Sequence, residues 1–259
     1  MQERMSITAQ RIEGPAGQLH VDDGGTGGVP VVFVHSFAGS GSHWTSQLAH
    51  ARATRRAVTF DLRGHGRSTA PSNNDYRIES LAEDLAAVID GLQLERAVLV
   101  GHGLGASVSA AYASEQPDRV GGLLLVVPPG KVPGDQAQKT IQALESDFDK
   151  VSAAYYEKLL SGAQPNVRSV IMLDAQRLPR ETALALIKAS QTYDPVSALQ
   201  RYEGPKLSIV TPSSDTPLDL HNVLRDLPRV HMDGTSHWSQ LDKPDEFNRH
   251  LDEFLAQIR

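Results

Sequence analysis

The chain has 259 residues, of which 40% are hydrophobic and 22% charged, as is typical of a soluble globular protein with one large core. Its formal net charge of −6 disfavours nucleic acid or an anionic membrane as the main partner, and its lack of cysteine excludes disulfides and thiolate chemistry. The first 14 residues contain no apolar segment typical of a secretory signal, and no apolar run approaches the roughly 20 residues of a membrane span. We therefore expect a cytoplasmic protein.

The first half of the chain predicts strands that alternate with helices. Residues 5–28 alternate apolar and polar side chains and end in glycines at 24–28, which predicts an antiparallel hairpin. Between residues 80 and 92 a stripe of apolar side chains predicts a helix, with Ser80 and Glu83 as its capping box. Continuous apolar runs predict strands buried on both faces at 30–35, 56–61, 96–101 and 120–127. This alternation predicts βαβ units and a mostly parallel sheet.

The pattern changes in the second half of the chain. Residues 129–195 contain helical patterns without strands, and apolar runs return only at 206–211 and 229–233. The chain closes with an amphipathic helix. We therefore expect an α/β core formed by residues 1–128 and 196–259, with residues 129–195 as a helical lid.

The segment "AVLVGHGLGASVSAAY", residues 97–112, reads as a strand, a tight turn and a helix. Its glycines fit a nucleophile elbow, G-x-S-x-G, in which Gly103 stands where the serine is expected. They also fit a dinucleotide fingerprint, G-x-G-x-x-A. That alternative needs an acidic residue at the end of the next strand, where the sequence reads "LLLVVPPG", and it belongs in a first βαβ unit. The elbow is therefore the favoured interpretation.

Two further residues follow predicted strands at the edge where open α/β sheets build their sites. Asp215 comes after the strand at 206–211, and His237 comes after the strand at 229–233. An acyl-transfer site needs a base beside the nucleophile and an acid that orients the base, in the chain order nucleophile, acid, histidine. Asp219 is a competing acid, but we expect it to begin the next helix, so Asp215 is preferred.

Four segments together resemble the α/β-hydrolase superfamily, in the branch of lidded esterases, lactonases and carbon–carbon bond hydrolases. "VVFVHSFAGSGSHW" resembles the oxyanion loop, usually H-G-x-x-G-S, and "FDLRGHGRS" resembles a segment typical of that branch. "VGHGLGAS" resembles the elbow, usually G-H-S-x-G, and "GTSHWSQLDKPDEF" resembles the histidine loop. The chain departs from the pattern at Ser36, where glycine is usual, and at Gly103, where serine is usual.

The resemblance implies an α/β-hydrolase fold, a mostly parallel sheet flanked by helices with a helical lid, and assigns roles by position. Gly103 takes the nucleophile position, Asp215 orients His237, and His237 is the general base. The N–H groups of Phe37 and Leu104 form the oxyanion hole. Contacts to the substrate are expected from Ser36, Phe37, His102 and Trp238. No metal or cofactor is implied.

Gly103 leaves three functional interpretations open. The chain is a carboxylic ester hydrolase whose nucleophile has been replaced and whose activity is strongly reduced, or a natural serine-less hydrolase in which His237 activates water or peroxide, or a lidded binding module. The expected partner is a small ester, lactone or related carbonyl compound, with no role for nucleic acid or membrane. Ser36 is disfavoured as a substitute nucleophile, because an oxyanion loop directs backbone N–H groups toward the substrate.

Overall fold

The structure, a computed structural model, describes residues 8–258. Its eight-stranded sheet has the order β1-β2-β4-β3-β5-β6-β7-β8, in which β1, β2 and β4 pair antiparallel and all later neighbours pair parallel. The strands are β1 Thr8–Gly14, β2 Gly17–Gly24, β3 Val31–Val34, β4 Ala57–Phe60, β5 Ala97–His102, β6 Val120–Val126, β7 Lys206–Val210 and β8 Arg229–His231. The predicted mostly parallel α/β sheet is confirmed.

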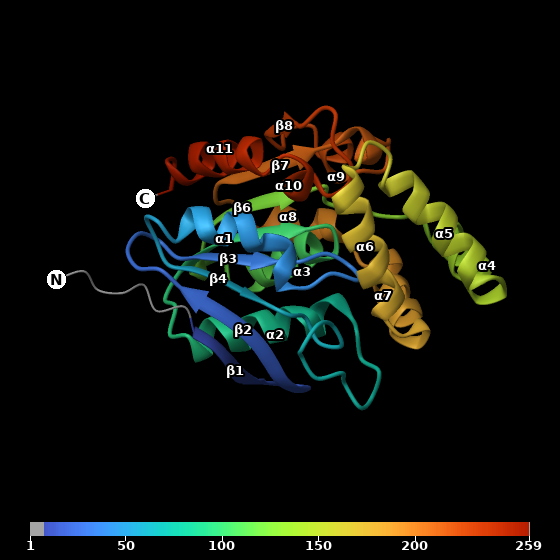
Figure 1. Ribbon diagram of the computed structural model, residues 1–259, viewed down its shortest axis with the longest axis horizontal. Coiled ribbons are helices and arrows are strands. Elements are labelled where there is room, and N and C mark those ends of the chain that lie inside the picture. The colour runs from blue at the N-terminus through green and yellow to red at the C-terminus, as the bar shows by residue number, and fades with distance from the viewer. Residues whose placement is uncertain (1–7, 259) are drawn as a thin grey trace.

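Helices cover both faces of the sheet (Figure 1). One face packs against α2, α3 and α8, and the other packs against α1 and α11. Helices α4 to α7 stand beyond one end of the strands, and no strand lies between β6 and β7. The helices are α1 Thr45–Ala51, α2 Ile78–Gly91, α3 Leu104–Glu115, α4 Gly134–Ser146, α5 Phe148–Leu159, α6 Pro165–Arg177, α7 Arg180–Thr192, α8 Pro195–Arg201, α9 Leu220–Val223, α10 Ser239–Asp242 and α11 Pro244–Leu255.

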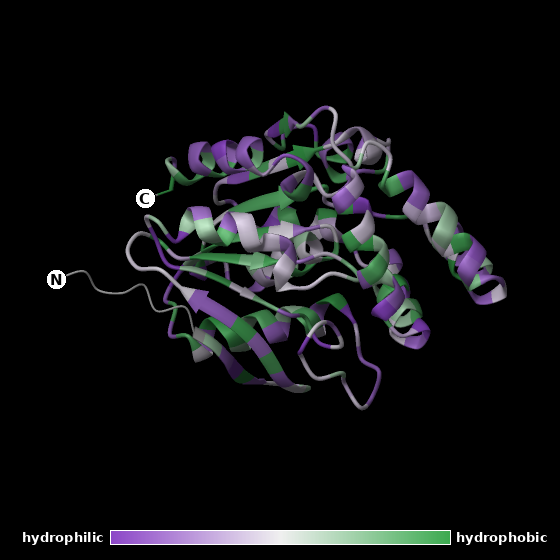
Figure 2. Cartoon of the chain, viewed as in Figure 1, coloured by the Kyte–Doolittle hydropathy of each residue, from purple (hydrophilic) through white to green (hydrophobic). Residues whose placement is uncertain are grey.

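The alternation of side chains along the central strands explains these two layers. In β5, Leu99 belongs to the cluster shared with α2 and α3, whereas Val98 and Val100 belong to the cluster shared with α1 and α11. Strands buried on both faces need apolar residues at every position, which is why their sequences are continuous apolar runs. The central strands are accordingly hydrophobic along their length, while α11 shows both hydrophilic and hydrophobic residues (Figure 2).

Two local expectations need correction. The predicted hairpin exists, but its turn lies between Gly14 and Gly17, and the glycines at 24–28 instead end β2; residues 5–7 of that prediction lie outside the described residues. The predicted capping box at Ser80 is wrong, because α2 begins two residues earlier, at the buried Ile78. The Ser80 hydroxyl instead donates to the Asp75 carboxylate at 2.8 Å.

Within residues 8–258, none of the helices combines the length and the apolar character that crossing a membrane requires.

Gly101 and Gly105 allow the first turn of α3 to lie close against the sheet, directly after β5. A Cβ on Gly105 would lie 2.3 Å from the carbonyl oxygen of Val34 and 2.6 Å from that of His35. A Cβ on Gly101 would lie 2.4 Å from the Gly105 carbonyl oxygen. All of these neighbours are backbone atoms, which cannot rotate away, so the turn between β5 and α3 tolerates no side chain at these two positions.

We therefore expect Gly105→Ala to lower the free energy of unfolding by at least about 1–3 kcal/mol, because the new methyl group overpacks against backbone. Gly134→Ala is the matched control: this glycine also lies in a helix, and a Cβ there would meet nothing within 4 Å. The control should be neutral or slightly stabilising. Urea denaturation of the two variants checks this, and equal losses in both would contradict the close approach at Gly105.

Candidate active site

The turn after β5 has the geometry of an elbow. Gly103 separates β5 from α3 and has φ +52° and ψ −111°, a conformation that is nearly free for glycine and costly for any residue with a side chain. Its N–H donates to the Val126 carbonyl at 2.9 Å, and its own carbonyl accepts from the Ala106 N–H at 3.0 Å. The backbone at residue 103 is therefore fixed from both sides at the carboxyl end of the central strands.

The loop after β3 is held by His35. Its Nδ1 donates to the Ser36 carbonyl at 2.8 Å and its Nε2 accepts from the Leu62 N–H at 2.9 Å, so the ring supports the loop and is not free to act as a base. Burial lowers the pKa of His35 well below its usual range, which keeps the ring neutral. The Gly39 N–H also donates to the Ser36 carbonyl at 3.0 Å, across a turn in which Ala38 has φ +54°.

Two backbone N–H groups at this edge of the sheet are free. Leu104 is the first residue of α3, and the first N–H groups of a helix have no acceptor within it. Phe37 lies in the turn that His35 holds, and no acceptor for its N–H exists within residues 8–258. Both residues line the same cavity, so their N–H groups are available to an oxygen of a bound ligand.

His237 is anchored through its backbone to the end of β5 and to the end of α5. Its N–H donates to the Leu159 carbonyl at the end of α5, at 3.0 Å, and its carbonyl accepts from His102 Nε2, also at 3.0 Å. His102 Nδ1 accepts from the Gln240 amide at 3.2 Å. The expected substrate contact of His102 is therefore wrong: the ring is fully buried, and both of its nitrogens are used to hold the histidine loop.

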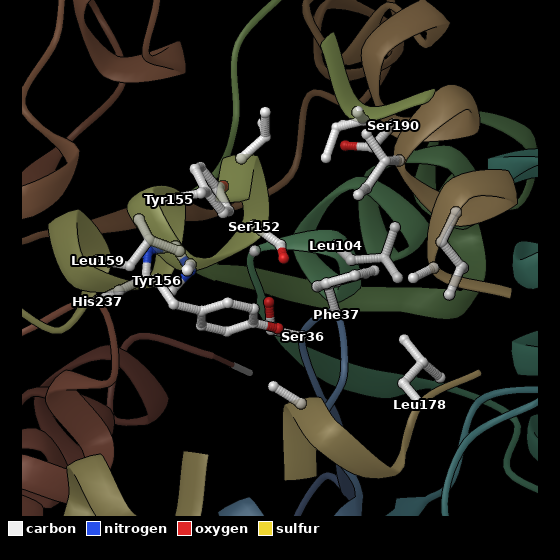
Figure 3. A pocket seen from close by; sticks show the side chains of 18 of the residues that line it. Ser36, Phe37, Leu104, Ser152, Tyr155, Tyr156, Leu159, Leu178, Ser190 and His237 are labelled. Atoms are coloured by element: carbon white, nitrogen blue, oxygen red, sulfur yellow. The ribbon is translucent and has the colours of Figure 1, made fainter. Parts of the chain in front are cut away.

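The imidazole of His237 faces the place where an elbow side chain would begin. A Cβ on Gly103 would lie 3.4 Å from His237 Nε2 and only 2.3 Å from Ser36 Oγ. Ser36, Tyr156 and His237 gather around the same part of the cavity in Figure 3. The structure thus brings together Ser36, Phe37, Gly103, Leu104 and His237, all of which were singled out from the sequence.

Asp215 is not part of this group. Its carboxylate accepts from the Asn222 amide at 2.9 Å and from His221 Nε2 at 3.1 Å, and these hydrogen bonds hold the pKa of Asp215 below its usual range. Its side chain is 50% exposed. The buried Nδ1 of His237 has no hydrogen-bond partner within residues 8–258. The expected Asp215–His237 pair is therefore not formed, because Asn222 and His221, carried by α9, bind the carboxylate instead.

Without a carboxylate beside it, His237 is a weak base. Burial lowers the pKa of His237 to about 4, since the interior disfavours the charged imidazolium. Asp219, the competing acid, comes immediately before α9, as expected, and accepts from the Thr216 N–H at 2.6 Å. Because burial lowers the pKa of His237, the neutral imidazole predominates at pH 7, and within residues 8–258 its Nε2 makes no hydrogen bond that would prevent it from accepting a proton.

A cavity of about 540 Å³ is lined by His237 and by residues of helices α4 to α7. Trp238 forms part of its wall, stacked against Tyr156 with ring centroids 6.4 Å apart and an interplanar angle of 9°. Tyr156 and Met172 also line the cavity, whereas Leu173 is 49% exposed. No sequence signal separated these lid residues, because all three are apolar or aromatic and lie in short amphipathic helices.

A serine at the elbow should be strained in this structure. We expect Gly103→Ser to lower the free energy of unfolding by about 0.5–2 kcal/mol, because of the positive φ and because its Cβ would approach the Ser36 hydroxyl. Ser36→Gly removes that hydroxyl, so the double variant should lose less stability than the two single variants predict together. Urea denaturation of the four proteins measures this coupling, and additivity within about 0.5 kcal/mol would contradict the close approach.

Comparison with known proteins agrees with the fold. A family model described as "alpha/beta hydrolase fold" matches residues 29–161. An esterase from Thermogutta terrifontis has a TM-score of 0.83 over 96% of this chain and 98% of its own, at 22% identity. An enol-lactonase from Burkholderia xenovorans has a TM-score of 0.82 over 96% of this chain and 100% of its own, at 21% identity. At these identities the two structures show the fold alone.

One sequence relative is similar over most of the chain, a mouse sn-1-specific diacylglycerol lipase that is 28% identical over 250 residues, or 87% of this chain and 80% of its own length. Other relatives match over 96–124 residues at 33–39% identity, and the matched part spans only 29–44% of their length. The family model covers just over half of the residues, and the mostly parallel sheet flanked by helices agrees with its description. The chain belongs to the α/β-hydrolase fold family.

Proposed function

We propose that the cavity binds and hydrolyses a small carboxylic ester or lactone, with His237 as the general base and the N–H groups of Phe37 and Leu104 as the oxyanion hole. The observation that carries this proposal is the position of His237 Nε2, 3.4 Å from the point that a Cβ on Gly103 would occupy, in a cavity that Phe37 and Leu104 also line. A reacting carbonyl needs a base on one side and donors for its developing charge on the other. The names of the relatives, which include an esterase, a lipase and an enol-lactonase, support the same class of substrate.

The cavity favours an apolar substrate of modest size. Its volume of about 540 Å³ is in the range of small-molecule sites. Apolar side chains dominate the wall above the site, among them Leu144, Leu159, Leu178 and Leu186. An ester with an aliphatic or aromatic acyl group would bury these surfaces, while its carbonyl oxygen accepts from the N–H groups of Phe37 and Leu104.

Gly103 changes the route of the reaction. Without a side chain, the elbow residue cannot form an acyl-enzyme, so the covalent route through position 103 is closed and turnover should be strongly reduced. His237 Nε2 can instead take a proton from a water molecule whose oxygen bonds to the carbonyl carbon. The oxyanion then collapses, the carbon–oxygen bond to the alcohol breaks, and the alcohol takes the proton from His237. Oxyanion donors and substrate binding alone retain about 10³-fold or more over water in related sites.

The alternative of a binding module is favoured by the unpartnered Nδ1 of His237, because a base that no acid orients is a poor catalyst. Hydrolysis of a panel of short-chain p-nitrophenyl esters and lactones by the unmodified chain and by His237→Ala separates the two. A slow reaction that His237→Ala abolishes supports hydrolysis. Saturable binding of the same esters, with turnover equal in both proteins, supports the binding module.

The pH dependence of hydrolysis should report the burial of His237. Only the neutral imidazole accepts a proton, so kcat/KM should rise as pH passes upward through about 4, the pKa set by burial, and then stay level. The measurement is kcat/KM for p-nitrophenyl butyrate against pH, with circular dichroism to confirm that the chain is folded at the acid end. A midpoint at or above the ordinary value for histidine would contradict an unpaired His237, since a neighbouring carboxylate raises that pKa.

Asp215 should contribute little to the rate. In a Ser-His-Asp triad, replacing the acid with asparagine costs about 10⁴-fold in kcat. Because Asp215 binds Asn222 and His221 here, we expect Asp215→Asn to change kcat/KM less than about 10-fold. Steady-state kinetics on the same ester tests this, with Asn222→Ala as a control for disturbance of α9. A thousandfold loss confined to Asp215→Asn would show that the carboxylate reaches His237 during turnover.

A further inference from the structure

Ser36 and Gly103 are the two positions at which this chain departs from the usual family pattern, one by gaining a serine and the other by losing one. The oxyanion loop usually has glycine where this chain has Ser36, and the elbow usually has serine where this chain has Gly103. The two residues come from different loops, after β3 and β5, and these strands are direct neighbours in the sheet. The site therefore keeps one serine and one glycine at this point, with their positions exchanged.

The Ser36 hydroxyl lies where the elbow side chain is missing. Its Oγ is 2.3 Å from the point that a Cβ on Gly103 would occupy, and its own Cβ is 3.3 Å from that point. Such an approach is possible only because residue 103 is glycine, since a real Cβ at that distance would clash with the hydroxyl. The expectation that this loop directs only backbone toward the substrate is therefore wrong, because Ser36 directs its hydroxyl into the space above the elbow.

The surroundings of this hydroxyl suit a nucleophile. Ser36 is 5% exposed and lines the cavity, and within the described part of the chain its Oγ makes no hydrogen bond. His237 Nε2 is 3.4 Å from the same point above Gly103, and among residues 8–258 it makes no hydrogen bond either. The two atoms are not hydrogen-bonded to each other, but such contacts are often long in a ligand-free enzyme and tighten when substrate binds.

The oxyanion donors also suit attack from Ser36. In an ordinary elbow, one donor is the N–H of the residue that follows the nucleophile. Phe37 follows Ser36 directly, so its free N–H has the same relation to the Ser36 hydroxyl. The Leu104 N–H at the start of α3 then becomes the donor that the neighbouring loop supplies.

We propose that Ser36 is the nucleophile of this site, in place of the missing elbow serine. The proposal rests on the proposed ester hydrolysis. The Ser36 Oγ–H proton passes to His237 Nε2 while Oγ bonds to the acyl carbon, and the carbonyl electrons move to the oxygen held by Phe37 and Leu104. The bond to the alcohol then breaks, and the alcohol takes the proton from His237. A water molecule repeats the sequence, releasing the acid and restoring Ser36.

The test is covalent labelling with an alkyl fluorophosphonate, followed by peptide mass spectrometry. The serine oxygen bonds to phosphorus, fluoride leaves, and the proton passes to His237. Because the reagent reacts with the activated serine itself, the natural substrate need not be known. The unmodified chain should be labelled on Ser36. Ser36→Gly and His237→Ala should each lower the labelling rate at least about 100-fold. Ser42→Ala, a change of an exposed serine beyond the same loop, should leave it unchanged.

The double variant Ser36→Gly/Gly103→Ser separates failure of this inference from failure of the proposed function. It restores the usual family arrangement, so it should be labelled at residue 103 and should hydrolyse p-nitrophenyl butyrate. If the double variant reacts but the unmodified chain is not labelled on Ser36, the site is hydrolytic and Ser36 is not its nucleophile. Ester hydrolysis that is unchanged in Ser36→Gly would also show that Ser36 is not the nucleophile. If no folded variant is labelled or hydrolyses the ester panel, the proposed function itself is wrong.

Discussion

The close packing of α3 against β3 and β5 is the constraint on which the site depends. Gly101 and Gly105 allow backbone to touch backbone there, and a methyl group at either position would overlap a carbonyl oxygen or the helix backbone. Between these two glycines the chain reverses at Gly103, which has φ +52°. The first N–H of α3 and the surface of residue 103 are therefore presented at the carboxyl end of the sheet, where β3 delivers Ser36 and Phe37.

The same turn also positions the base. His102 ends β5, and its ring joins the elbow to the histidine loop by two hydrogen bonds, at 3.0 Å to the His237 carbonyl and at 3.2 Å from the Gln240 amide. On its other side, the His237 N–H donates to the carbonyl of Leu159, the last residue of α5. Among the described residues no carboxylate, the usual third support, bonds to His237 Nδ1, and hydrogen bonds of the His237 backbone hold its loop.

The fold could be predicted from the sequence because its signals are local and redundant. Apolar runs predicted β3 to β7 to within one or two residues, and the glycines of the elbow predicted the turn at Gly103. The start of α2 was missed because Ser80 and Glu83 match a capping box, whereas the helix begins at the buried Ile78. In the site, position along the chain predicted which residues lie near His237, since parallel strands end at one edge.

Side-chain direction was the part that the sequence could not predict. Asp215 follows β7 as a triad acid should, but Asn222 and His221 lie within reach and bind it. His102 has the place expected of a substrate contact, but its ring turns toward the histidine loop. Ser36 was expected to contribute only its backbone. Its Oγ instead lies 2.3 Å from the point that a Cβ on Gly103 would occupy, so the hydroxyl fills the space left by Gly103. Each of these outcomes depends on a competing neighbour from another segment.

The most direct test of the central claim, that this site is hydrolytic and uses His237 as its base, is the rate of hydrolysis of p-nitrophenyl butyrate by the unmodified chain and by His237→Ala at equal protein concentration and pH 7. We expect a slow but saturable reaction in the first protein and only the buffer rate in the second, with both folded by circular dichroism. Equal rates in the two proteins would contradict the assignment of the base.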